Sequence, residues 1–81
     1  MPRFYFDLNV NGDLSLDQHG EEFATKREAH RQAILALAEI AAEKIPENGT
    51  LDIRMLVADD LHRPVAQAHV HFEPDTRRIR E

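Results

Sequence analysis

The chain has no cysteine among its 81 residues, so neither a disulfide nor a thiolate zinc site can hold it together. It also has no apolar run long enough to span a membrane, and its first residues lack the apolar segment and cleavage site of a secretory signal peptide. Its formal net charge is −5, which weighs against nucleic acid as the main partner, because phosphate binding needs a positive surface. These absences predict a cytoplasmic protein that binds neither membrane nor nucleic acid.

The motifs of common catalytic sites are missing as well. The sequence contains no glycine-rich phosphate loop, no G-x-S-x-G nucleophile elbow and no H-E-x-x-H zinc motif. Ser15 is the only serine, and Asp59 and Asp60 are neighbouring acids in a loop rather than a pair in a pocket that raises one pKa. One helix over a sheet of this size also leaves little room for a drug-sized cleft. We therefore expect neither an enzyme nor a cofactor.

Apolar and polar residues alternate near the N-terminus. Arg3 to Val10 has the period of two that is typical of a half-buried strand. Asn11-Gly12 then suits a two-residue type I′ turn, because both positions of that turn need a positive φ. The sequence predicts a returning strand over Asp13 to Asp17, with Leu14 and Leu16 pointing into the core.

A helix follows a predicted loop at Gln18 to Glu22. Thr25 and Glu28 form a T-x-x-E capping box, and the apolar period then changes to 3.6 residues. Pro46 is expected to end the helix. The residues of the predicted apolar face are Ala29, Ala33, Ile34, Leu37, Ala38, Ile40, Ala41 and Ile45, with His30 among them.

The second half of the chain repeats the alternation of strands. Leu51 to Ala58 and Val65 to Phe72 are predicted strands, joined by a loop at Asp59 to Arg63. Together the elements predict an α+β fold of ββαββ order: a four-stranded, mainly antiparallel sheet with one helix packed on one face. We expect a single domain over residues 1–73 and a charged C-terminal tail over residues 74–81.

Several short motifs carry a resemblance to a known family. They are Met1-Pro2-Arg3-Phe4-Tyr5-Phe6, Asn11-Gly12, Asp17-x-x-Gly20-x-Glu22, Val57-x-Asp59 and Arg63-Pro64-Val65. On these residues the chain resembles an uncharacterised family of short α-proteobacterial, rhizobial-type proteins, a domain of unknown function. The resemblance implies a fold and an origin but no activity. Members of that family tend to carry glycine where this chain has His62, which predicts a positive φ there.

A possible calcium loop overlaps the first hairpin. Asp7, Asn9 and Asn11 stand at alternate positions before Gly12, as oxygen ligands do in an EF-hand, and the match runs on to Ser15. The twelfth position, however, is a glutamine without the closing carboxylate, and the preceding segment is too short and aromatic for an entering helix. An Asn-Gly hairpin explains the same residues without a metal.

A second possible metal site is His69-x-His71. On a strand, two imidazoles with this spacing project from one face and can chelate zinc or nickel. Outward residues of the other strands could lie nearby and offer a third ligand; they are Tyr5, Asp7, Asp52 and Arg54. The alternative interpretation is the solvated face of a one-layer sheet, where alternating polar residues are expected.

The face opposite the helix is also a candidate interaction surface. Its predicted residues are Tyr5, Arg54, Leu56, His69 and His71, a mixture of aromatic, cationic and polar groups. A sheet that is bare on one side suits a protein partner, including a second copy of the chain. We therefore expect a small non-catalytic interaction domain that self-associates through the exposed sheet face. The alternative is a metal-binding or metal-sensing protein that uses His69 and His71, or the Asp7 to Ser15 loop.

Overall fold

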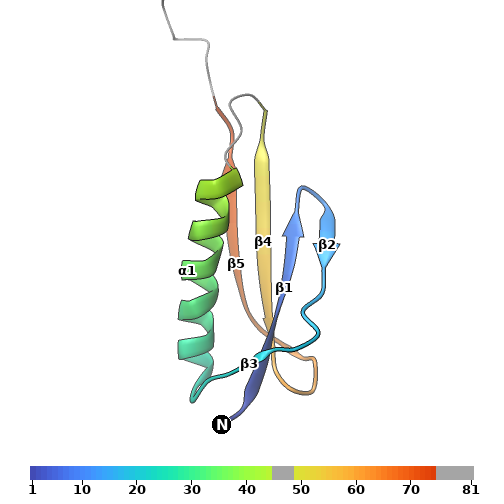
Figure 1. Cartoon of the computed structure of the whole chain (residues 1–81), viewed down its shortest axis with the longest axis vertical. Coiled ribbons are helices and arrows are strands. Elements are labelled where there is room, and N and C mark those ends of the chain that lie inside the picture. Colours follow the sequence, from blue (N-terminus) through green and yellow to red (C-terminus); the bar gives the residue numbers. More distant parts are fainter. Residues whose placement is uncertain (45–48, 75–81) are drawn as a thin grey trace, which may run out of the picture.

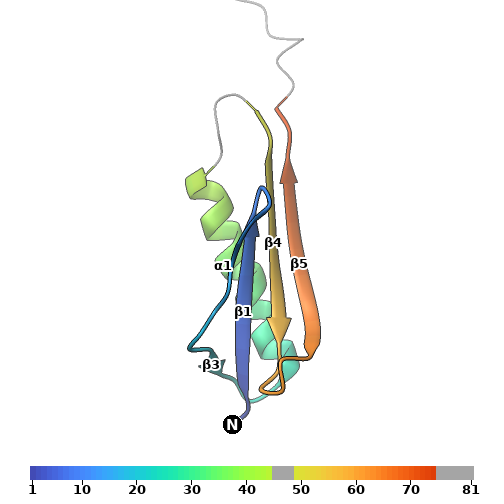
Figure 2. The same cartoon turned by 90° about the vertical axis from the view of Figure 1, so that its right-hand side faces the viewer.

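The computed structural model describes residues 1–44 and 49–74. Its elements are β1 (Arg3–Val10), β2 (Asp13–Ser15), β3 (Glu21–Glu22), α1 (Lys26–Lys44), β4 (Leu51–Ala58) and β5 (Pro64–Phe72). The strands form an antiparallel sheet in the order β2-β1-β4-β5, and α1 lies along one face against β4 and β5 (Figures 1 and 2). This α+β architecture is the predicted one. The predicted tail lies outside the described residues from position 75 onward.

The turn between β1 and β2 has the predicted type. Asn11 and Gly12 both have positive φ, 51° and 94°, as a type I′ turn requires. The Asn9 side-chain oxygen accepts the Gly12 N–H at 2.8 Å. Asn11 in turn exchanges two hydrogen bonds of 2.8 Å with the backbone of Asp52, so the turn is fastened to the start of β4.

The register of this hairpin corrects one prediction. The two-residue turn places Val10 opposite Asp13, so Leu14 falls opposite Asn9. Residues directly opposite share a face, and Leu14 therefore lies on the polar face rather than in the core. Leu14 and Leu16 are 62% and 64% exposed, and the prediction that they point inward is wrong.

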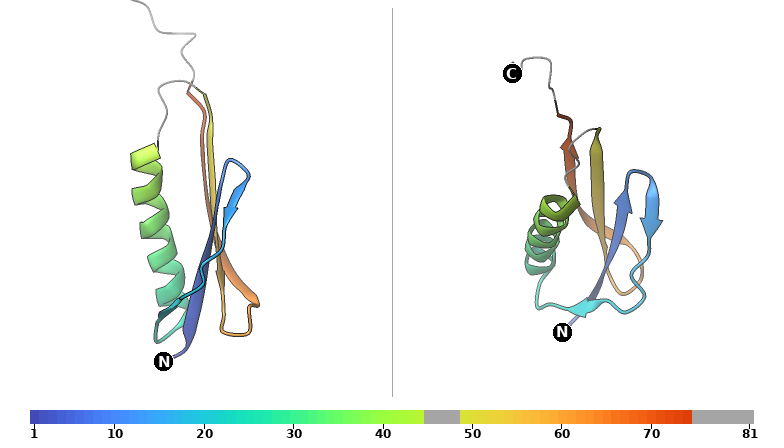
Figure 3. Two further views of the ribbon diagram at one scale, coloured as in Figure 1. Left: turned by 45° about the vertical axis from the view of Figure 1, so that its right-hand side comes forward. Right: turned by 45° about the horizontal axis from the view of Figure 1, so that its top comes forward.

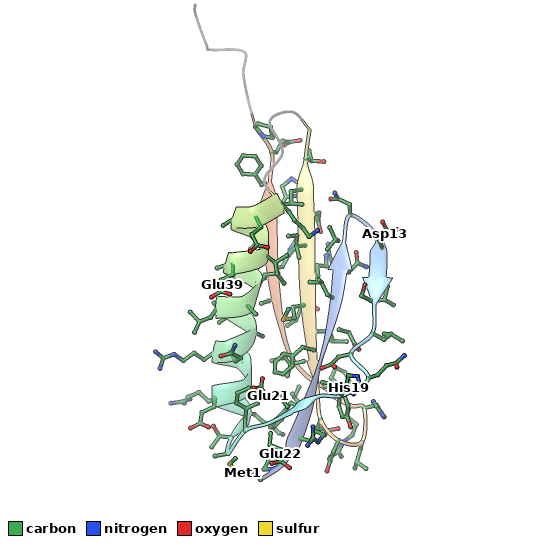
Figure 4. All side chains as sticks on the ribbon, viewed as in Figure 1. Met1, Asp13, His19, Glu21, Glu22 and Glu39 are labelled. Atoms are coloured by element: carbon green, nitrogen blue, oxygen red, sulfur yellow. The ribbon has the colours of Figure 1, made fainter. Side chains whose placement is uncertain are left out.

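The chain between β2 and the helix is held by Asp17. The second strand was predicted to continue to Asp17, but β2 ends at Ser15. A short strand, β3, forms inside the segment that was predicted to be a loop (Figure 4). The Asp17 carboxylate accepts backbone N–H groups of Phe6, His19 and Gly20 at 3.0–3.1 Å. Burial raises the pKa of Asp17, but these hydrogen bonds outweigh it and lower the pKa below its ordinary value.

Gly20 permits the close approach of this segment to β1. Its φ is +69°, and a Cβ there would lie 2.8 Å from the Phe4 carbonyl oxygen. A backbone atom of a paired strand cannot move aside cheaply, so only glycine fits. Asp17 and Gly20 together fasten β3 against the first half of β1.

The helix begins where the capping box predicts. The Thr25 hydroxyl accepts the Glu28 N–H at 3.1 Å, whereas the Glu28 carboxylate reaches back to the Ala24 N–H at 3.3 Å. The predicted stop at Pro46 lies outside the described residues, as does Ile45. Within the part of the chain that the structure describes, no helix is long and apolar enough to cross a membrane.

The buried stripe of the helix is narrower than predicted. Ala29, Ala33, Leu37 and Ala41 are buried and Ile40 is partly buried. Ile34 is 49% exposed and Ala38 is exposed as well, so placing these two in the core was wrong. The reason is that α1 spans only β4 and β5, and a single strand pair covers a narrow arc of a helix.

The core lies between α1 and the sheet. Ile53 and Val57 of β4 are fully buried, as the alternation in β4 predicts. Phe23 closes one end of the core, with its ring centroid 6.3 Å from that of Phe4 and 5.8 Å from that of Phe6. The remaining inward residues of β1 and β5 are only partly buried.

The second hairpin is closed by a buried carboxylate. The Asp59 side chain accepts the N–H groups of Leu61 and Arg63 and the Arg63 Nε–H, each at 2.9 Å. The backbone hydrogen bond from Arg63 is the main cause that lowers the pKa of Asp59. His62 has a φ of +60°, as the comparison with glycine at this position predicts.

Candidate functional site

The sheet face opposite the helix is bare over the described residues. The views in Figure 3 show α1 on one side of the sheet only. The cross-strand pairs that share the other face are Asn9 with Arg54, Asp7 with Leu56, Arg54 with His69, Asp52 with His71, and Leu56 with Gln67. This set, with Leu14 and Leu16 of the β2 side, is called the open face below.

Asp52 is the centre of a polar cluster on the open face. One carboxylate oxygen lies 3.1 Å from His69 Nε2, and the other lies 3.1 Å from His71 Nδ1. Since a carboxylate only accepts, each of these ring nitrogens carries a hydrogen. The hydrogen bonds from His71 and then His69 lower the pKa of Asp52, which keeps it ionised.

Arg54 adds a permanent positive charge to this cluster. Its Nε lies 3.4 Å from the Asp52 carboxylate, and 55% of its side chain is exposed. The charges are exposed to water, so the pair contributes little to folding. What the cluster provides is a surface on which β4 carries both signs of charge, beside the two histidines of β5.

Three leucines form an apolar patch beside the charged cluster. Leu14 and Leu16 are largely exposed, and Leu56 is 36% exposed. With Asp7 and Arg54, among others, they line an open hollow of about 240 Å³. Sequence reasoning found only Leu56. The two-residue turn could have shown that Leu14 belongs to the open face, because it pairs residue 10 with residue 13 on one face and residue 9 with residue 14 on the other.

Tyr5 lies apart from the other residues of the predicted surface. Its ring stacks against His62 of the second hairpin at a centroid distance of 5.1 Å. It also lines a second open hollow of about 380 Å³, with Asp17 and Gln18 among its neighbours. The structure thus brings Arg54, Leu56 and the two histidines together on β4 and β5, and places Tyr5 beside the loop that joins these strands.

The comparison with known families covers nearly all of this architecture. A domain of unknown function, DUF6894, matches residues 3–71. The chain belongs to this family. No curated protein and no solved structure matches the chain.

The motif residues of this DUF6894 chain have structural roles. Asp17 and Gly20 fasten the β2–β3 segment to β1, and Asp59 and Arg63 close the second hairpin. Asn11-Gly12 makes the first turn. The residues behind the resemblance therefore explain the fold, and the open-face cluster lies outside them.

The candidate calcium ligands of the DUF6894 domain are occupied by backbone groups. Asp7 accepts the Asp17 N–H at 2.9 Å, and the Asn9 and Asn11 oxygens each accept an N–H of the hairpin or of β4. Among residues 1–44 and 49–74, no group of three or more His, Asp or Glu side chains is arranged to hold a metal ion. In the histidine pair, the Asp52 carboxylate lies between the two rings, with one oxygen on each.

Proposed function

We propose that this DUF6894 chain is a small, non-catalytic interaction domain that binds a second copy of itself through the open face. The observation that carries the proposal is the exposed leucine patch of Leu14, Leu16 and Leu56, next to a cluster with both signs of charge. Apolar groups exposed in contact with each other, rimmed by polar ones, are typical of protein-binding surfaces.

The charges favour a second copy as the occupant. In an interface with two-fold symmetry, the same patch meets itself, so it must supply both partners of each contact. Asp7 and Asp52 supply acids, and Arg54 supplies a cation, all on the open face. A patch of one sign would repel its own copy, whereas this one is self-complementary.

The size of the open face fits a weak dimer. Strands β1, β4 and β5, of eight, eight and nine residues, are about 26–30 Å long, whereas β2, of three residues, is about 10 Å long. At a strand spacing of about 4.8 Å, the footprint of the open face is roughly 440 Å². Stable interfaces bury about 800 Å² on each partner. Association should therefore depend on concentration in the micromolar range.

Among the described residues, the only side chain that forms a hydrogen bond with His69 or His71 is the Asp52 carboxylate, which supports a non-catalytic role. His69 and Asp52 resemble the base and its orienting acid in a hydrolase, which would need a hydroxyl or thiol beside the ring. The sequence has no cysteine, and its one serine, Ser15, pairs with Leu8 and so lies on the helix side of the sheet. The proposed cellular location is the cytoplasm. The α-proteobacterial origin is an expectation that rests on the resemblance alone.

Light scattering after size-exclusion chromatography tests the proposal. The measured mass should rise above the 9.3 kDa of a monomer as the protein concentration increases. Leu14→Asp should weaken this association, because it would bury an unpaired carboxylate in the interface. Leu61→Asp is the matched control, because Leu61 is 66% exposed but lies outside the hollow. Equal association of the two variants would refute the role of the open face.

Metal binding by His69 and His71 is the second candidate function. The observation in its favour is that both rings already converge on one carboxylate, Asp52. Calorimetric titration with Zn²⁺ tests it, with His71→Ala as the variant that removes one ligand. Heat that is saturable in the native chain and absent from the variant would support the site; no heat in either would exclude it.

A further inference from the structure

The outer edge of β5 presents backbone groups that pair with no described strand, although the Gln67 carbonyl oxygen has the His30 ring as a side-chain partner. The N–H and C=O of Asp52 both point to β1, because they bond to Asn11. In an antiparallel sheet these groups alternate in direction along the strand, so Asp52 does not bond to His71 opposite it. The backbone groups of His71, His69 and Gln67 therefore point away from β4, and no described strand lies beyond them.

The helix side above this edge is apolar and exposed. His30 Nε2 lies 3.3 Å from the Gln67 carbonyl oxygen, so this side of α1 overlooks the outer edge of β5. Ile34 and Ala38 follow His30 at intervals of four residues, which keeps them on the same side. Both are exposed, Ile34 by 49%, whereas the neighbouring Leu35, also exposed, lies about 100° further round the helix.

We propose that a second copy of the chain pairs with this edge, β5 against β5 in antiparallel orientation, to form a continuous eight-stranded sheet. A two-fold axis at His69 pairs His69 with its copy and Gln67 with His71 of the other copy. All three residues direct their backbone groups outward, so the pairing forms about six hydrogen bonds. No other edge of the sheet is as long, because β2 and β3 have three and two residues.

The same pairing brings the two helices to packing distance. The helix contacts both β4 and β5, so its axis lies over this strand pair, about half a strand spacing inside the edge. Adding the strand spacing of about 4.8 Å across the new pair gives an axial separation of about 10 Å. Packed helices are separated by 8–10 Å, so the contact needs no rearrangement.

The apolar helix residues also match in height. The helix and β5 run in the same direction (Figure 1). Ile34 is four residues, about 6 Å, beyond His30, and His69 is two residues, about 6.6 Å, beyond Gln67. A two-fold axis at His69 therefore places Ile34 opposite its copy, with the small Ala38 allowing close approach. This match between strand and helix is why a second copy, rather than an unrelated peptide, fits the edge.

Edge pairing is independent of open-face association. Its two-fold axis is perpendicular to the sheet, whereas the axis of a face-to-face contact lies parallel to it. Where these two perpendicular axes intersect, the two contacts together close an assembly of four chains, a tetramer. Either contact alone produces a dimer, and the mass of each variant shows which contact remains.

The first test compares Ile34→Asp with Leu35→Asp by sedimentation equilibrium on the full chain. The two variants introduce the same charge at exposed positions one residue apart. Ile34→Asp should weaken association at least about tenfold, because it buries two like charges side by side, and Leu35→Asp should not. Leu14→Asp, which disrupts the open face, should leave the edge dimer intact. Equal association of the Ile34 and Leu35 variants, or a monomer at every concentration, overturns the proposal.

The second test removes the backbone donor at the centre of the pairing. His69→Pro lacks the outward N–H, which a monomer does not use, and His69→Thr keeps it. Only the proline variant should lose the edge dimer. In the native chain, the amides of Gln67, His69 and His71 should exchange hydrogen more slowly as concentration rises. Exchange at these amides that is fast and independent of concentration refutes the pairing.

Discussion

Replacing Gly20 by alanine should destabilise the fold far more than its half-buried position suggests. The residue has a φ of +69°, which costs an L-residue about 1–2 kcal/mol. The new Cβ would also lie 2.8 Å from the Phe4 carbonyl oxygen, in a strand that cannot shift without losing its pairing with β3. Moving the segment instead sacrifices the hydrogen bond from the Gly20 N–H to Asp17, which costs about another 1 kcal/mol.

The expected total is about 2–4 kcal/mol, a large share of the 5–15 kcal/mol that stabilises a typical domain. Gly12→Ala is the matched control, because its φ is +94° but its Cβ would meet no atom within 4 Å. Urea unfolding followed by circular dichroism should therefore separate the two variants by about 1–2 kcal/mol, at an unchanged slope. Equal losses would refute the close contact between this segment and β1.

Three further predictions concern the core, a carboxylate and a strained turn. Leu37→Ala should cost about 2–5 kcal/mol by opening a core cavity, whereas Leu35→Ala at the surface should cost under about 0.5 kcal/mol in the same urea assay. The pKa of Asp17 is lowered by folding, so its stabilising contribution is present above its ordinary pKa and is lost as pH falls through the folded value. The stability difference between the native chain and Asp17→Asn should accordingly be constant near neutral pH and shrink below about pH 4; a difference that is constant down to pH 2 would contradict this. His62→Asn should lower the free energy of unfolding by about 0.5–1.5 kcal/mol, because it removes the ring contact with Tyr5. His62→Gly also removes this contact but relieves the positive φ, so it should be the more stable of the two variants. Thermal unfolding of both variants checks this order.

Most of the fold could be predicted from local patterns. The alternation in β4, the Asn11-Gly12 turn and the start of the helix at Thr25 were all confirmed. Each depends on residues close together in the sequence, where the period and the turn chemistry decide the structure. The positive φ of His62 could likewise be predicted, because the resemblance gave glycine at that position.

The errors arose where placement depends on a distant partner. Leu14 was assigned to the core because it is apolar, although the turn had already placed it on the other face. Ile34 was assigned to the core because the helical period was taken to define the buried arc, but the sheet beneath α1 decides how wide that arc is. The carboxylate shared by His69 and His71 needed the register of β4 and β5, which the sequence did not specify.

The two sides of the sheet differ in what they allow a chain to build. Beyond β1, the neighbouring strands are short and separated by the bend at Asp17, so that side is a poor template for another strand. A sheet that can be extended from one side only cannot polymerise, since the first addition consumes the sole growing end. The contacts of Asp17 and Gly20 that fasten β3 to β1 would then protect the protein from fibre formation. A variant without these contacts would lose solubility as well as stability.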